Sequence, residues 1–218
     1  RLSGGPGVHR FVWDLHGTPL PDARPEYPMT AVYHETPPQP TAPWVVPGNY
    51  SIVLTTTGKS FSQPLSVKMD PRIKVTAAEL TKQFDLSKRL QDLRAELQPI
   101  GKSYEPLVRQ LEKARERAGE GSLKEPLENL RKKLEEFANP EAVRSGGPLQ
   151  VDVLEKVTKL FDDLQSVDAA PTPQQEIAIG KLQADVRSVL ERWQAVPPAV
   201  AALNLQLQSA GLEPIKLP

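Results

Sequence analysis

The chain has 218 residues and a formal net charge of zero, because 27 lysine and arginine residues balance 27 aspartate and glutamate residues. This balance provides no global attraction to nucleic acid or to an anionic membrane. The absence of cysteine excludes a disulfide framework, a cysteine nucleophile and zinc bound by thiolates. No apolar run approaches the roughly 20 residues that a membrane-spanning helix needs, so we expect no membrane span.

Residues 1–75 show the alternation of apolar and polar residues that is typical of half-buried strands. The stretches VHRFVWDL (8–15), NYSIVLTT (49–56) and KSFSQPLSVKM (59–69) carry it. The turn TTGKS predicts that the second and third form a hairpin, and Pro64 indicates a sheet edge or a bulge, because proline lacks the N–H donor. The side chains expected in the β core are Phe11, Trp13, Tyr50, Ile52, Leu54, Phe61, Leu65 and Val67.

The proline-rich residues 17–47 cannot form the interior of a regular sheet, so we interpret them as a long connection. TAVYHE (30–35) is a candidate short edge strand within it. Only three or four strands can be counted, fewer than a complete sandwich needs. The expected β domain is therefore small and lacks part of its sheet.

Residues 76–210 show helical periodicity. Thr76 and Glu79 form a capping-box pattern at the start of the first helix, whose apolar stripe is interrupted at Pro99 and ends at GEG (119–121). Thr172 followed by Pro173 is a second favourable helix start. Further apolar stripes occupy residues 123–137, 153–164, 177–193 and 200–207. Because the connections are short, the economical packing is an up-and-down bundle.

The predicted fold class is therefore α+β with two domains. Residues 1–75 form an antiparallel β-sandwich-like domain, and residues 76–218 form an α-helical bundle.

Three patterns that could carry chemistry have simpler explanations. TTTGKS ends like a phosphate-binding loop, but Val53 stands where the full pattern needs its first glycine, and the loop joins two strands. Of the histidines, His9 and His16 lie near Asp14, yet only His34 could complete a metal site, and no metal-ligand spacing exists. We therefore predict no metal site.

Catalysis by paired carboxylates would need two of them fixed in one cleft. The helical carboxylates mostly alternate with lysine and arginine, as on a solvated helix face, and no nucleophile motif is present. We expect neither catalytic residues nor a cofactor in this chain. The carboxylates of the β region are scattered: Asp14, Asp22, Glu26, Glu35 and Asp70.

Three aromatic residues, Tyr27, Tyr33 and Trp44, lie in the proline-rich connection. They either cover the open face of the small sheet or are presented for stacking on a sugar or a peptide. Covering the sheet is the favoured interpretation.

Several segments together resemble one bacterial family. These are GVHRFVWDL, PGNYSIVLTTTGKSFSQPLSVKMDPR, VTAAELTKQFDLSKRLQDL and ALNLQLQSAGLEPI. They are similar to the C-terminal region of large BNR-repeat or sortilin-like β-propeller proteins known as glycosyl hydrolases. There, an immunoglobulin- or fibronectin-like domain and a helical region follow the propeller. The similarity covers nearly the whole chain, and its motifs are structural rather than catalytic.

The resemblance implies a non-catalytic accessory module of an exported protein, located in the periplasm or outside the cell. Its implied partner is an upstream propeller, and because the chain begins with Arg1 we expect part of a longer protein. Two alternatives remain: a carbohydrate-binding module, or a part that assists a glycosidase site on the propeller. Oligomerisation remains open.

Overall fold

The computed structural model is an α+β protein that divides into two compact units. Unit 1 comprises Arg1–Gln91 and Asp162–Pro171, and unit 2 comprises Asp92–Phe161 and Thr172–Pro218. The structure describes residues 5–21, 23, 27, 29–32, 35–36, 38–119, 121–139, 144 and 151–217.

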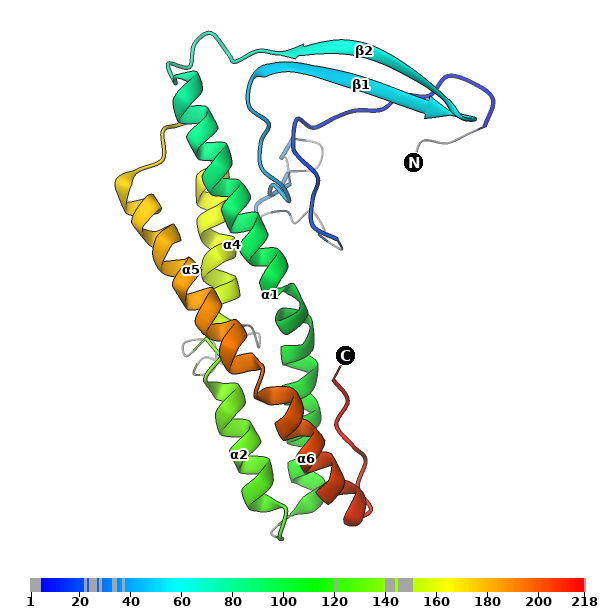
Figure 1. The fold of residues 1–218 in the computed structure, drawn as a ribbon, viewed down its shortest axis with the longest axis vertical. Helices are drawn as coiled ribbons and strands as arrows, with labels where there is room; N and C mark the ends of the chain where they lie inside the picture. The colour runs from blue at the N-terminus through cyan, green and yellow to red at the C-terminus, as the bar shows by residue number, and fades with distance from the viewer. Residues whose placement is uncertain are drawn as a thin grey trace. The chain divides into compact units, whose positions relative to one another are not determined.

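Two strands and several helices follow one another along the chain (Figure 1). The strands form one antiparallel sheet of two strands. Helices α1 and α4 each contribute residues to both units. The elements are β1 (Gly48–Thr56), β2 (Lys59–Val67), α1 (Ala77–Ala118), α2 (Lys124–Glu135), α4 (Asp152–Gln165), α5 (Pro173–Trp193) and α6 (Val196–Ser209).

β1 and β2 form the predicted hairpin, with register from Gly48 opposite Val67 to Thr56 opposite Lys59. Thr57 and Gly58 form the turn, and both have positive φ angles, 44° and 78°. Two such residues define a type I′ turn, whose twist matches that of the strands. Gly58 thus lies in a turn between two strands, and Lys59 and Ser60 lie in β2, which agrees with the rejection of a phosphate-binding loop.

The hairpin has one apolar face and one face rich in hydroxyl groups. Tyr50, Ile52 and Leu54 share the apolar face with Phe61 and Leu65. Ile52, Leu54 and Phe61 are exposed by half or more of their surface. The alternation therefore predicted correctly which residues share a face. The prediction that this face is buried was wrong, because no described element covers it.

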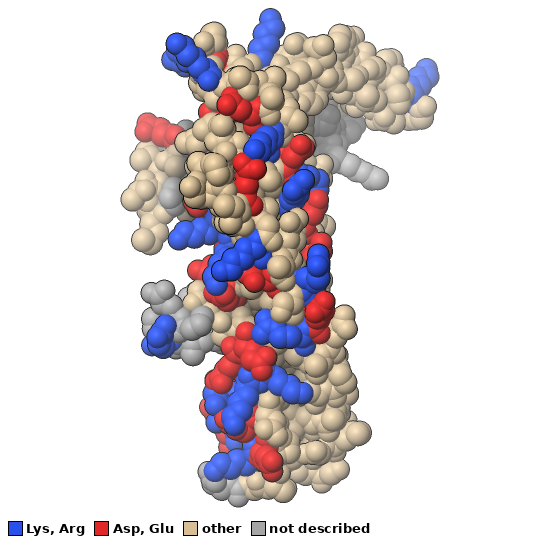
Figure 2. Space-filling model, turned by 60° about the vertical axis from the view of Figure 1, so that its left-hand side comes forward, with Lys and Arg blue, Asp and Glu red and all other residues tan. Residues whose placement is uncertain are grey.

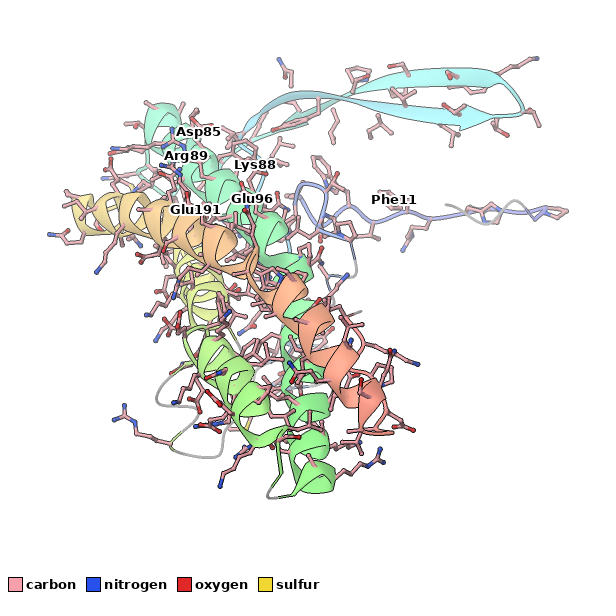
Figure 3. The ribbon with its side chains drawn as sticks, turned by 60° about the horizontal axis from the view of Figure 1, so that its bottom comes forward. Phe11, Asp85, Lys88, Arg89, Glu96 and Glu191 are labelled. Carbon is pink, nitrogen blue, oxygen red and sulfur yellow. The ribbon has the colours of Figure 1, made fainter. Side chains whose placement is uncertain are left out.

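The first predicted strand, residues 8–15, is not part of the sheet. Phe11 is 72% exposed and extends from an irregular segment (Figure 3). Trp13 is half-buried rather than a core residue, and Leu15 has a positive φ of 63°. A leucine in this region of φ interrupts regular strand geometry, so alternation alone did not suffice to form a strand.

α1 begins with the predicted capping box. The Thr76 N–H donates to the Glu79 carboxylate at 2.8 Å, and the Glu79 N–H donates to the Thr76 hydroxyl at 3.2 Å. The expected interruption at Pro99 is wrong, because α1 continues through both Pro99 and Pro106. Each proline removes a helical N–H donor. Buried neighbours such as Leu107 keep the helix continuous by packing.

In unit 2, helix α6 packs against α2 and α5. The hydroxyl of Tyr104 on α1 donates to the carbonyl of Leu134 on α2 at 3.1 Å. Burial, together with the nearby Glu135 carboxylate, raises the pKa of Tyr104 to about 12, which favours the neutral phenol that donates this bond. The up-and-down arrangement of the whole helical region remains a prediction.

The predicted start of α5 is confirmed. The Thr172 hydroxyl accepts from the Gln175 N–H, and Pro173 occupies the first turn. α6 starts at Val196, four residues earlier than its apolar stripe indicated. Its two prolines fit there because the first turn needs no intrahelical N–H donors.

The chain after α6 is held by side-chain amides. Asn204 donates to the carbonyl of Ile215 at 2.8 Å and accepts from the Ile215 N–H at 2.7 Å. Gln110 makes the same pair of bonds with Lys216, each at 2.9 Å. Ile215 is buried as a result, so an extended segment is fixed to two helices without a sheet.

Charges of both signs are interspersed over the helical surface in Figure 2. Asp85, Lys88 and Arg89 are exposed on one stretch of α1 (Figure 3). In unit 2, Arg131 pairs with Glu128 at 2.6 Å and also with Glu135. The prediction of solvated helix faces with ion pairs is confirmed.

The capping box predicts a pH dependence. Hydrogen bonds from the backbone and hydroxyl of Thr76 hold the pKa of Glu79 below its ordinary value. The resulting stability is present above the unfolded pKa of about 4.3 and is lost as the pH falls through the folded pKa. Glu79→Gln keeps an acceptor but does not titrate. Thermal melts followed by circular dichroism should therefore show a smaller acid-induced loss of stability in Glu79→Gln than in the wild type. Parallel losses would contradict this.

Two helical glycines should respond oppositely to alanine. A Cβ on Gly101 would lie 2.7 Å from Cδ2 of Leu154, whereas one on Gly180 meets nothing within 4 Å. Gly180→Ala should raise the free energy of unfolding by about 0.5–1 kcal/mol through helix propensity. Gly101→Ala should gain less or lose stability, because the Leu154 side chain must move. Urea denaturation of both variants checks this, and equal gains would refute the close approach.

Candidate functional site

In unit 1, Trp44 lies where the segment before β1 pairs with the N-terminal segment. His16 and Trp44 form an isolated antiparallel β-bridge, next to a 2.9 Å hydrogen bond from the Val45 N–H to the Leu15 carbonyl. The rings of His16 and Trp44 lie with centroids 3.8 Å apart and planes tilted by 35°. One face of the Trp44 indole is thus occupied by the imidazole.

A second aromatic contact continues from this point. Trp13 donates its indole N–H to the carbonyl of His16 at 2.8 Å, and its ring meets Tyr50 edge-on with centroids 5.6 Å apart. The hydroxyl of Tyr50 donates to the carbonyl of Val46. These polar tips are satisfied locally, so the rings serve as packing surfaces.

Gln165, at the end of α4, accepts two hydrogen bonds from Trp44. Its side-chain oxygen accepts from the Trp44 backbone N–H at 2.7 Å, and its carbonyl accepts from the indole N–H at 3.3 Å. Its amide group donates to the hydroxyl of Ser87 on α1 at 2.7 Å. One buried amide therefore joins the extended segment to two helices.

Two glutamines of α1 also donate hydrogen bonds to backbone carbonyls, and the sequence patterns predicted none of these three residues. Gln83 donates to the carbonyls of Leu164 and Val167 at 2.5 and 2.7 Å. Gln91 donates to the carbonyl of Thr18 at 3.0 Å. A signal was available, since positions 83, 87 and 91 lie four residues apart on the apolar side of the helix.

A pocket of about 210 Å³ opens beside Trp44. Val46, Val67, Leu80 and Phe84 form apolar walls. Trp44 remains 41% exposed and lines the same pocket. The pocket thus combines apolar walls with a partly exposed tryptophan.

Charged groups also line the pocket. Asp70 is bound by Arg72, whose side-chain and backbone hydrogen bonds lower the pKa of the carboxyl group. Lys68 and Asp168 are further lining residues. Such a pocket suits an apolar or flat group held by packing and stacking.

The pair Asp14 and His16 does not form an accessible acid–base site. His16 Nδ1 lies 3.3 Å from a carboxylate oxygen of Asp14. Both ring nitrogens of His16 are buried and make no hydrogen bond within the described residues. A general base must reach a proton on its substrate, and here Trp44 covers the imidazole.

The other sequence-predicted positions do not converge. His9 binds the carbonyl of Gly5 at 2.7 Å, and Tyr27 is exposed. In the part of the chain that the structure describes, no group of three or more potential metal ligands occurs. Tyr33, His34, Asp22 and Glu26 lie outside the described residues.

Comparison with known proteins gives no match among family models, curated proteins or solved structures. Among the helices that the structure describes, none is both long and apolar enough to cross a membrane.

The Gln165 contacts predict a measurable cost of substitution. Gln165→Leu would leave the part-buried Trp44 N–H without this acceptor, so stability should fall by about 1–3 kcal/mol. The exposed Gln174→Leu is the matched control and should change stability by less than about 0.5 kcal/mol. Chemical denaturation followed by tryptophan fluorescence measures both, and equal effects would be inconsistent with the described role of Gln165.

Proposed function

We propose that this chain is a non-catalytic accessory module of a larger exported BNR-repeat, glycosyl-hydrolase-like protein, and that it acts by protein contact. The exposed apolar face of the hairpin carries the proposal. An apolar patch of this kind marks an interaction site, since soluble proteins rarely leave one open. The family resemblance supports the propeller as the partner and the periplasm or cell exterior as the location.

In this proposal, residues 1–75 are the immunoglobulin- or fibronectin-like part, and β1 and β2 are two of its strands. A hairpin of two strands is marginally stable alone, and a hydrophobic face needs further strands or another packing partner. The helical residues 76–218 act as a spacer with up-and-down packing. The nearly balanced charges of that part give it little attraction for polyanions.

A matched pair of substitutions tests the contact. Ile52 lies on the apolar face and Val53 on the opposite one, with similar exposures of 54% and 60%. Ile52→Ser should weaken binding to a separately produced BNR-repeat propeller about tenfold, and Val53→Ser should not. Isothermal titration calorimetry provides the measurement. Absence of binding by the unsubstituted chain would refute the proposed partner.

One observation favours carbohydrate binding as a second candidate. Trp44 lines the pocket and is 41% exposed, and stacking on sugars uses exposed aromatic rings of this kind. A panel of polysaccharides should shift the tryptophan fluorescence of the wild type but leave Trp44→Ala unchanged. If no polysaccharide changes fluorescence or affinity-gel mobility, this candidate is eliminated.

A further inference from the structure

The two outer edges of the hairpin differ in their capacity to accept a strand. A two-residue turn closes on a hydrogen-bonded pair, which is Thr56 with Lys59. Antiparallel ladders alternate, so every second pair from there directs its N–H and C=O groups outward. On β1 these outward residues are Asn49, Ser51, Val53 and Thr55, and on β2 they are Ser60, Ser62, Pro64 and Ser66.

Pro64 therefore interrupts the outer edge of β2. Its nitrogen carries no hydrogen and stands where that edge should present a donor, opposite Ser51. The outer edge of β1 has no such gap. It pairs with no other described strand (Figure 1). The side of β1 away from β2 is the edge equipped for strand addition.

β1 also fits an antiparallel copy of itself. It has nine residues, GNYSIVLTT, and Ile52 is the central one. A two-fold axis at Ile52 would place Ser51 of one copy opposite Val53 of the other, and Asn49 opposite Thr55. All outward N–H and C=O groups of β1 would then have partners. Tyr50 would then face Leu54 on the apolar side. β1 contains no charged residue, so the copies would not repel each other, and charge does not protect this edge from pairing.

We propose that the outer edge of β1 is a self-association site, where a second copy of this chain adds its own β1 antiparallel about Ile52. The product is a four-stranded sheet in the order β2, β1, β1 of the second copy and β2 of the second copy. This meets the need for three or more strands. The inference goes beyond the proposed function, because it uses the edge of the hairpin and needs no propeller.

Two proline substitutions at directly opposed positions test which edge associates. Val53 and Ser62 face each other, and the N–H of each points outward, one from β1 and the other from β2. The full chain should show a concentration-dependent dimer in sedimentation equilibrium. Val53→Pro should raise the dimer dissociation constant about tenfold or more. Ser62→Pro should leave it unchanged.

Single cysteines test the register, and the chain has no native cysteine to interfere. In the proposed pair, the two Ile52 residues face each other at a Cα distance of about 4.5 Å, which a disulfide can span. The two Leu54 residues would lie about 13 Å apart. With oxidised glutathione, Ile52→Cys should form a covalent dimer and Leu54→Cys should not. Both side chains are about half exposed, so the oxidant should reach a cysteine at either position equally well.

Each alternative result overturns the proposal in a recognisable way. A monomer at all concentrations would reject the second copy. If the Val53 amide of that monomer nonetheless exchanged slowly with deuterium, the edge would belong to another segment, such as residues 5–13. A dimer that Ser62→Pro disrupts but Val53→Pro does not would assign association to β2. Propeller binding is measured separately, so either proposal can fail alone.

Discussion

The buried side chain of Gln165 organises unit 1. It accepts from the backbone of Trp44 and donates to Ser87, so an irregular segment gains a fixed place against α1 and α4. Extended segments without sheet partners must satisfy their polar groups in another way. Here, helical amides supply those partners, and Gln91 does so again at the carbonyl of Thr18. The aromatic contacts of Trp44 and the pocket beside it depend on this arrangement.

The sequence was informative where local chemistry decides structure. The Thr76 and Thr172 caps form as predicted because their hydrogen bonds join residues three positions apart. The place of Gly58 in the hairpin turn also follows from local backbone preference, because glycine takes a positive φ without strain. The continuity of α1 through Pro99 was missed, since packing along a long helix outweighs the loss of one donor. Distant partners decide such cases, and periodicity does not identify them.

Less of the candidate site than of the local structure could be predicted from the sequence. Of the proposed stacking residues, Trp44 lines a pocket, and its position depends on a residue 121 positions away. The prediction of a buried core in the β region was wrong for a related reason. Alternation assigns Ile52, Leu54 and Phe61 to one face, but it cannot supply the layer that buries it. These three residues are therefore exposed, although they alternate as the residues of a half-buried strand do.

Pro64 has a further consequence for the size of an assembly. An antiparallel sheet with two complete edges can extend without limit, as fibrils do. A sheet that pairs through β1 ends on both sides at β2, where the missing N–H weakens further addition. The same two-fold arrangement is closed, in contrast to a head-to-tail chain. In the proposed assembly, Pro64 thus favours a finite complex over polymerisation.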